Sequence, residues 1–146
     1  MRSWGNVLAL CGLGILAGGM LFFGAVMAPL VFTRLPLPVA GGFIRDAFPW
    51  YDSFQLVFAA LALLGLLLRR AWVAALVPAV VIAASLWAWL WLLPVMDRLK
   101  AANDSAGFSF WHAVSTWVNG AELLLVLLLL IRTAAPQRLT HEEIPK

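Results

Sequence analysis

Charged residues are scarce in this chain. Only 12% of its 146 residues are Asp, Glu, Lys or Arg, and 64% are hydrophobic, whereas a soluble domain carries roughly a quarter charged residues. There is too little polar surface to cover a soluble globule, so the natural solvent of most of this surface is lipid. The formal net charge of +3 is not a nucleic-acid signal. The basic residues stand singly or in pairs at the edges of apolar runs, without an arginine-rich tract or zinc-finger spacing.

Several motifs of enzyme chemistry are also missing. Cysteine occurs once, at Cys11, which excludes an intramolecular disulfide. The chain has no phosphate-binding glycine loop and no Ser-His-Asp arrangement, and we expect no pair of carboxylates at membrane depth. His112 and Glu122 are separated by about 15 Å along a helix, too far to hold one small reacting group together. An enzyme is therefore the weakest function class.

Four apolar runs are each long enough to cross a bilayer core, which takes about 20 helical residues. They predict an all-α integral membrane four-helix bundle, arranged up-down-up-down, in one domain of residues 1–133. The expected helices span residues 7–32, 49–68, 71–96 and 107–131, followed by a polar tail at 134–146. Pro49 and Asp52 suit the first turn of the second helix, and the prolines and glycines of residues 33–50 predict a loop before it.

Basic residues predict the orientation of the bundle. The side with the termini and the 69–70 turn holds Arg2, Arg69, Arg70, Arg132, Arg138 and Lys146. On the other side, four basic residues are diluted by four aspartates. The positive-inside rule therefore predicts that both termini are cytoplasmic.

Polar side chains gather on one side of the fourth predicted helix. At 100° per residue, His112, Ser115, Asn119 and Glu122 fall within about a quarter-turn arc, with Thr116 at its edge. If this helix starts outside, His112 lies about one turn below the outer surface and Glu122 lies near the bilayer centre. The run after Glu122 is apolar. The pattern predicts a polar path that enters from the outside and stops halfway.

Glu122 is the costly member of this stripe, because an ionised and unpaired carboxyl at the midplane costs several kcal/mol. The groups expected at similar depth are Ser85 and the Gly18–Gly19 backbone, and neither neutralises a charge. Three interpretations stay open. The stripe holds the bundle together by hydrogen bonds, or it forms an outward-open cation or proton site, or it contacts a partner subunit or cofactor.

The first predicted helix suggests further roles. Small residues on one side favour close packing within the bundle, with a homodimer face as the alternative; they are Gly14, Gly18, Ala25 and Ala28. Soft sulfur ligands for copper are available at Cys11, Met20 and Met27, although methionine commonly fills cores. Haem would need an axial ligand besides His112, because His141 lies in the tail. The metal and cofactor stay unidentified.

Three segments resemble the transmembrane-protein-205-like domain family. They are GGMLFFGAVMAPLVFTRL (18–35), AGGFIRDAFPWY (40–51) and FWHAVSTWVNGAELL (110–124). The resemblance covers the APLVF segment at 28–32 together with His112, Ser115 and Asn119, and it assigns no role to Glu122. It implies four helices, no established reaction, and a bacterial inner membrane or a eukaryotic internal membrane; of these we expect the bacterial inner membrane.

Two hypotheses for function follow. The first is a small integral membrane protein whose outward-open polar site binds or transports a cation, a proton or a small solute. The second is a non-catalytic accessory subunit that packs into a larger membrane complex. In both cases the partners are the lipid bilayer and a homo-oligomer or larger complex, and not nucleic acid.

Overall fold

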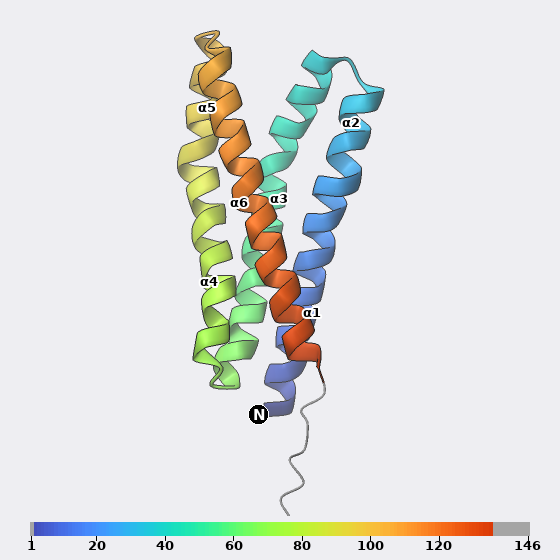
Figure 1. Ribbon diagram of the computed structural model, residues 1–146, viewed down its shortest axis with the longest axis vertical. Helices are drawn as coiled ribbons and strands as arrows, with labels where there is room; N and C mark the ends of the chain where they lie inside the picture. Colours follow the sequence, from blue (N-terminus) through green and yellow to red (C-terminus); the bar gives the residue numbers. More distant parts are fainter. Residues whose placement is uncertain (1, 136–146) are drawn as a thin grey trace, which may run out of the picture.

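The protein is an all-helical bundle over the described part of the chain. The computed structural model describes residues 2–135, with side-chain burial from Trp4 onward (Figure 1). Four helical stretches are long and apolar enough to cross a membrane: Trp4–Arg34, Leu37–Leu68, Trp72–Ala101 and Ser105–Ala134. No strand occurs within residues 2–135. The prediction of an all-helical membrane protein with four spans is confirmed. Most of the predicted tail, residues 136–146, lies outside the described residues.

Two of the four spans are interrupted by short π-helical segments. The first span consists of α1 (Arg2–Leu21), η1 (Phe22–Met27) and α2 (Ala28–Arg34). The second is the single helix α3 (Leu37–Leu68). The third consists of α4 (Trp72–Trp87), η2 (Ala88–Leu92) and α5 (Leu93–Ala101), and the fourth is α6 (Ser105–Ala134).

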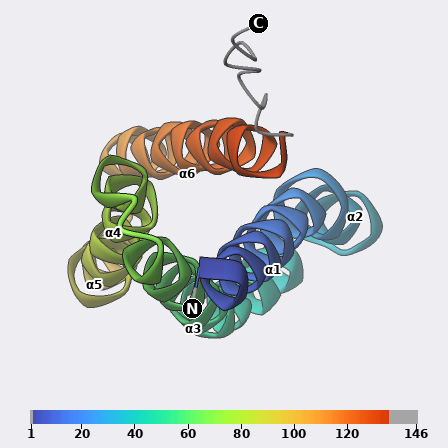
Figure 2. The same ribbon diagram turned by 90° about the horizontal axis from the view of Figure 1, so that it is seen from below.

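Short connections make consecutive spans antiparallel. We call the end that carries the 35–36 and 102–104 connections the distal end, and the opposite end, with the start of α1 and the end of α6, the proximal end. α1 packs along α3, α3 packs against α4, and α6 contacts α1, α4 and α5 (Figure 2). Toward the distal end, the ribbons of α2 and α3 diverge from those of α5 and α6 (Figure 1).

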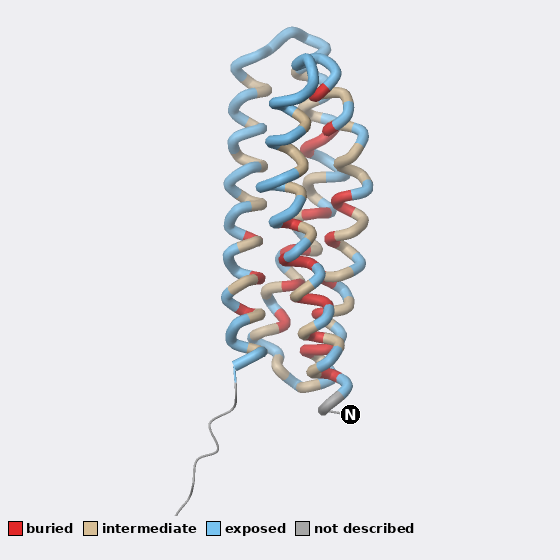
Figure 3. The backbone as a smooth tube through the Cα atoms, turned by 90° about the vertical axis from the view of Figure 1, so that its right-hand side faces the viewer, coloured by how far each residue is buried: buried red, intermediate tan, exposed pale blue. Residues whose placement is uncertain are grey.

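The apolar core is concentrated toward the proximal end, where most of the buried residues lie (Figure 3). Its closest helix contact joins α1 to α3. A Cβ added at Gly12 would meet the backbone of Ala62, and one added at Gly65 would meet the backbone of Ala9. These glycines therefore let the two backbones approach within a distance that no larger residue permits.

The small residues expected to pack the first helix lie elsewhere on its surface. A Cβ added at Gly14 or Gly18 would meet no atom within 4 Å, and Gly18 and Ala25 are exposed while Ala28 is half-buried. Close packing of Gly14 and Gly18 inside the bundle is therefore wrong. The buried face of α1 is the one that carries Gly12, and the phase of the helix turns the other small residues away from α3.

The second span begins at Leu37 and not at Pro49, so the loop expected over residues 33–50 is mostly helix. Pro36 is the residue before the helix and Pro38 lies in its first turn, where a missing N–H costs nothing. Pro49 lies inside α3, and the Ser53 hydroxyl donates a 2.7 Å hydrogen bond to the Pro49 carbonyl oxygen. In lipid, backbone groups must be satisfied internally, which favours helix even through such residues.

The other spans also extend beyond their predicted ends. The first runs over Arg2–Arg34 and the third continues to Ala101, because polar residues after Met96 still complete the last helical turns. The fourth begins at Ser105 and ends at Ala134. Asp104 is its N-cap and accepts a 2.9 Å hydrogen bond from the Gly107 N–H, as expected for a short acidic side chain in that position.

Candidate functional site

Four polar residues are buried inside the bundle among the described residues, and they come from three helices. Asp52 and Gln55 lie on α3, Ser85 lies on α4 and Glu122 lies on α6. Each lies near the middle of its span. Asp52 is only 4% exposed and Glu122 only 6%. We call these four residues, with the neighbouring Tyr51 and Asn119, the polar centre.

Two hydrogen bonds join the helices across the polar centre. The Ser85 hydroxyl donates to Gln55 Oε1 at 3.1 Å, which links α4 to α3. The Tyr51 hydroxyl donates to Asn119 Oδ1 at 3.1 Å, which links α3 to α6. The three helices that supply the polar centre are therefore connected through neutral side chains, and the two carboxyl groups take no part in these bonds.

The carboxyl groups of Asp52 and Glu122 are the unsatisfied members. Asp52 Oδ2 and Glu122 Oε1 are buried and have no hydrogen-bond partner. The two groups flank the Tyr51–Asn119 hydrogen bond: Asp52 follows Tyr51 on α3, and Glu122 lies one helical turn after Asn119 on α6. The one ion pair among residues 4–135 is Arg45–Asp97, so neither acid forms a salt bridge with a described residue. An ionised carboxyl group without a partner is unfavourable in lipid, so each of the two acids is suited to hold a proton or to face a small cation.

This pair corrects the expectation that no two carboxylates share membrane depth. Sequence reasoning placed Asp52 in the first turn of a helix that began at Pro49, near the membrane surface. Since α3 begins at Leu37, Asp52 instead lies about halfway along a 32-residue helix. The sequence contains a signal for the earlier helix start, because Pro36 and Pro38 fit a helix start as well as Pro49 does. A start there puts Asp52 and Gln55 near the middle of the helix.

The predicted polar stripe of α6 divides into two parts. Asn119 and Glu122 belong to the polar centre, whereas His112 and Thr116 are exposed and Ser115 is half-buried. The hydroxyls of Ser115 and Thr116 donate to the His112 carbonyl oxygen at 2.8 and 2.9 Å. These hydroxyls are thus satisfied within their own helix. They do not connect His112 to Glu122 in this arrangement.

Aromatic rings close the side of the polar centre that faces the first span. Phe23 of η1 stacks on Tyr51 with ring centroids 4.1 Å apart and an interplanar angle of 17°. Phe48 packs against the same two rings, edge-on to Tyr51. The Tyr51 ring is therefore held on its apolar faces while its hydroxyl reaches Asn119.

The residues considered as metal ligands do not gather in one place. Within residues 4–135, no group of three or more His, Cys, Asp or Glu side chains could hold a metal ion. Cys11 is exposed and Met20 is buried, so the two sulfur atoms lie on different faces of α1. The polar centre offers two carboxylates and neutral oxygens, which suit a proton or a hard cation and not copper.

Comparison with known proteins identifies a family for most of the chain. Residues 11–105 match a family described as a domain of unknown function, DUF4149. The matched segment contains Asp52, Gln55 and Ser85 and ends at the first residue of α6, before Glu122. No curated protein and no solved structure matches the chain. The family match gives no specific support to the resemblance to the transmembrane-protein-205-like domain.

Proposed function

We propose that this chain, which belongs to the DUF4149 family of unknown function, is a membrane protein that binds a small cation at its polar centre and carries it across the bilayer. The cation is a proton or a small hard metal ion. Asp52 and Glu122 supply the negative charge, and Gln55, Ser85 and Asn119 supply neutral oxygens. One observation carries the proposal: two acids, each buried near the middle of its span and each with an oxygen that has no partner.

Electrostatics explains why such a pair serves binding better than structure. An ionised carboxyl without a partner costs several kcal/mol at the bilayer centre, and a second one nearby adds repulsion. A proton or cation held between the two groups removes much of both costs. Adhesion between helices needs neither acid, because neutral side chains already link α3 to α4 and α6. A purely structural role leaves the cost of both carboxyl groups unexplained.

The distal side is the less densely packed route to the polar centre. No residue of α6 before Glu122 is buried, and the polar side chains of His112, Ser115 and Thr116 lie along this part of the helix. The proximal side is filled by the apolar core, including Val126 and Leu129 of α6. This asymmetry supports entry of the cation from the distal end.

Reconstitution into lipid vesicles tests the proposed function. Vesicles with a fixed internal solution would be challenged in turn with gradients of H⁺, Na⁺ and K⁺, and flux would be followed by dyes selective for each ion. Asp52→Asn and Glu122→Gln should each reduce the flux of the transported cation at least tenfold. Asp46→Asn is the matched control, because Asp46 is an exposed acid on the same helix.

The control should keep wild-type flux. A double Asp52→Asn, Glu122→Gln variant that carries ions as fast as the wild type would refute a role for the acid pair. If the wild type shows no more flux than empty vesicles, transport is refuted and only binding is left. Calorimetric titration of the purified protein with each cation measures binding directly.

The membrane and the orientation belong to the same proposal. We place the chain in a bacterial inner membrane with both termini in the cytoplasm, so that the distal end faces outward. Fusion of an enzyme that is active only in the cytoplasm to the C-terminus, and of the same enzyme to the 102–104 turn, tests this. Activity of the turn fusion and not of the C-terminal fusion would reverse the orientation.

Sparse burial of α6 favours a second candidate, an accessory subunit of a larger complex. Only Glu122, Val126 and Leu129 of this 30-residue helix are buried, and its exposed face includes the polar side chains of His112 and Thr116. A partner helix on that face would cover them. Native mass measurement after gentle solubilisation separates the candidates, since an isolated monomer or homodimer excludes a stable complex.

A further inference from the structure

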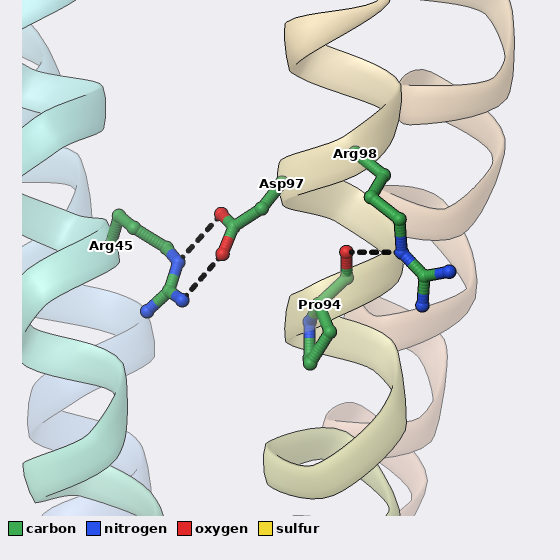
Figure 4. A network of polar contacts seen from close by, with 4 residues as sticks. All are labelled: Arg45, Pro94, Asp97 and Arg98. Atoms are coloured by element: carbon green, nitrogen blue, oxygen red, sulfur yellow. Dashed lines mark hydrogen bonds and ion pairs between the residues drawn. The ribbon is translucent and has the colours of Figure 1, made fainter.

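An ion pair joins the two diverging halves of the bundle distal to the polar centre. Arg45 of α3 donates from Nε to Asp97 Oδ1 at 2.8 Å and from Nη2 to Asp97 Oδ2 at 2.6 Å (Figure 4). This two-bond geometry is the strongest form of an arginine–carboxylate contact. Asp97 lies on α5, so the pair connects the second span to the third. The side chains are 38% and 47% exposed.

Arg45 lies on α3, on the distal side of Asp52. It precedes Asp52 by seven residues, which is close to two helical turns, so the two side chains leave the same face of the helix about 10 Å apart. Gln55 continues that face toward the proximal end. The ion pair thus lies distal to the polar centre, at the end of the bundle from which the cation is proposed to enter.

Buried residues are few in the distal parts of the bundle, where α3 contributes Ala40 and Ile44. α2 has no buried residue, α5 has only Leu93, and α6 has none before Glu122. Among residues 4–135, Arg45–Asp97 is the only side-chain contact by hydrogen bond or ion pair that links α3 to α5. Segments with few buried contacts open at low free energy, so this one contact has a large share in keeping α3 and α5 together.

The third span also contains a site at which it can bend. η2 (Ala88–Leu92) lies between Ser85 and Asp97, and the Leu93 N–H donates to the Ala88 carbonyl oxygen, five residues back. Pro94 follows at once and has no N–H of its own. The first span repeats this arrangement. At the end of η1 the Ala28 N–H donates to the Phe23 carbonyl oxygen, and Pro29 follows Ala28. π-helical turns and prolines are common causes of helix bends.

We infer that the Arg45–Asp97 ion pair is a gate that closes the distal entrance to the polar centre, and that α5 swings about η2 when the pair separates. The inference rests on the proposed function, because it assigns a role in access to the cation site. Closed, the pair ties α5 to α3. Open, it exposes Gln55, Ser85 and the two acids to water from the distal end.

Cysteine accessibility tests the gate without any need for ion transport. Ser85→Cys in a Cys11→Ala background places the one thiol of the chain at a buried position, 3% exposed in the native residue. A charged, membrane-impermeant thiol reagent is added to the protein in lipid nanodiscs, and the labelling rate is measured. Gln55→Cys in the same background is the second reporter, in case Ser85→Cys disturbs folding.

Breaking the pair should speed labelling at both reporter positions. Arg45→Gln or Asp97→Asn should raise the rate about fivefold, the change expected from loss of a favourable exposed ion pair. The reversed pair, Arg45→Asp with Asp97→Arg, should bring the rate back toward the starting value. Arg98→Gln is the matched control, because Arg98 is the neighbour of Asp97 but donates only to the Pro94 carbonyl oxygen of its own helix (Figure 4).

Equal labelling rates with and without the ion pair, at both reporters, would overturn the gate. So would a reversed pair that labels as fast as the single variants. These outcomes are independent of the cation site: labelling reports access to the centre even when no ion is bound or moved. Conversely, a gate that responds as expected in a protein without flux or cation binding would retain the gate and refute the proposed function.

Discussion

Replacing Glu122 with leucine should stabilise the protein and abolish cation binding. Glu122 is 6% exposed, and its Oε1 has no hydrogen-bond partner. A buried polar atom left without a partner costs about 1–3 kcal/mol. Leucine has a similar size, lacks that atom and continues the apolar surface formed by Val126 and Leu129. We therefore expect Glu122→Leu to raise the free energy of unfolding by about 1–3 kcal/mol.

The gain in stability should be accompanied by loss of function, as is common when a destabilising functional group is removed. Unfolding is followed in mixed micelles by titration with a denaturing detergent, and cation binding is followed by calorimetry on the same preparation. Thr116→Leu is the matched control: Thr116 is exposed on the same helix and its hydroxyl already bonds to the His112 carbonyl oxygen. Its effect should stay within about 0.5 kcal/mol.

Two outcomes would refute this reasoning. A Glu122→Leu protein that is less stable than the wild type would mean that the carboxyl group makes favourable contacts. Its oxygen would then not destabilise the folded state. A protein that is more stable and still binds and carries the cation would mean that Glu122 is merely tolerated in the bundle, and the acid pair would then have no function.

Three further predictions concern the centre and the core. At constant ionic strength, replacing choline by the bound cation at a hundredfold excess over its Kd should stabilise the wild type by about 2.7 kcal/mol; the double Asp52→Asn, Glu122→Gln variant should show no shift in its thermal midpoint. Tyr51→Phe keeps the ring stacked on Phe23 but loses the bond to Asn119, so the free energy of unfolding should fall by only about 0.6 kcal/mol; a loss several times larger would show that the hydroxyl does more than join two helices. Gly12→Val should prevent the close approach of α1 to α3 and lower the thermal midpoint strongly, whereas Gly14→Val, in open space, should leave it nearly unchanged; equal effects on the midpoint would refute the packing argument.

Hydropathy was sufficient to predict the four spans. A helix that crosses a bilayer needs about 20 mostly apolar residues, and the apolar runs of that length in this chain are the four spans. It failed at the start of α3. Proline and glycine between residues 36 and 49 are loop signals in water, but prolines at a helix start cost no hydrogen bond, and lipid penalises any unsatisfied backbone. The error mattered because it moved Asp52 from the middle of a span to its end.

The site itself was only half predictable for the same reason. Spacing along α6 identified Glu122 and Asn119, since one helix supplies its own register. Their partners on α3 and α4 depend on how the helices are placed beside one another, and spacing along one helix contains no such information. Ser85 was expected at the right depth, yet it contacts Gln55 and not Glu122. Spacing also suggested that the stripe runs without a break from His112 to Glu122. The hydroxyls of Ser115 and Thr116 instead donate to the backbone of their own helix.

Packing differs on the two sides of the polar centre, and this difference bears on how a cation would cross. Entry from the distal end requires α5 to separate from α3, where one ion pair and few buried side chains resist. Exit at the proximal end has to pass the apolar core, where α1 lies closely against α3 at Gly12 and Gly65. Passage through this core disturbs more buried side chains than the distal movement does. Under the proposed function, binding from the distal side should therefore be fast, and release at the proximal side should limit the rate of transport.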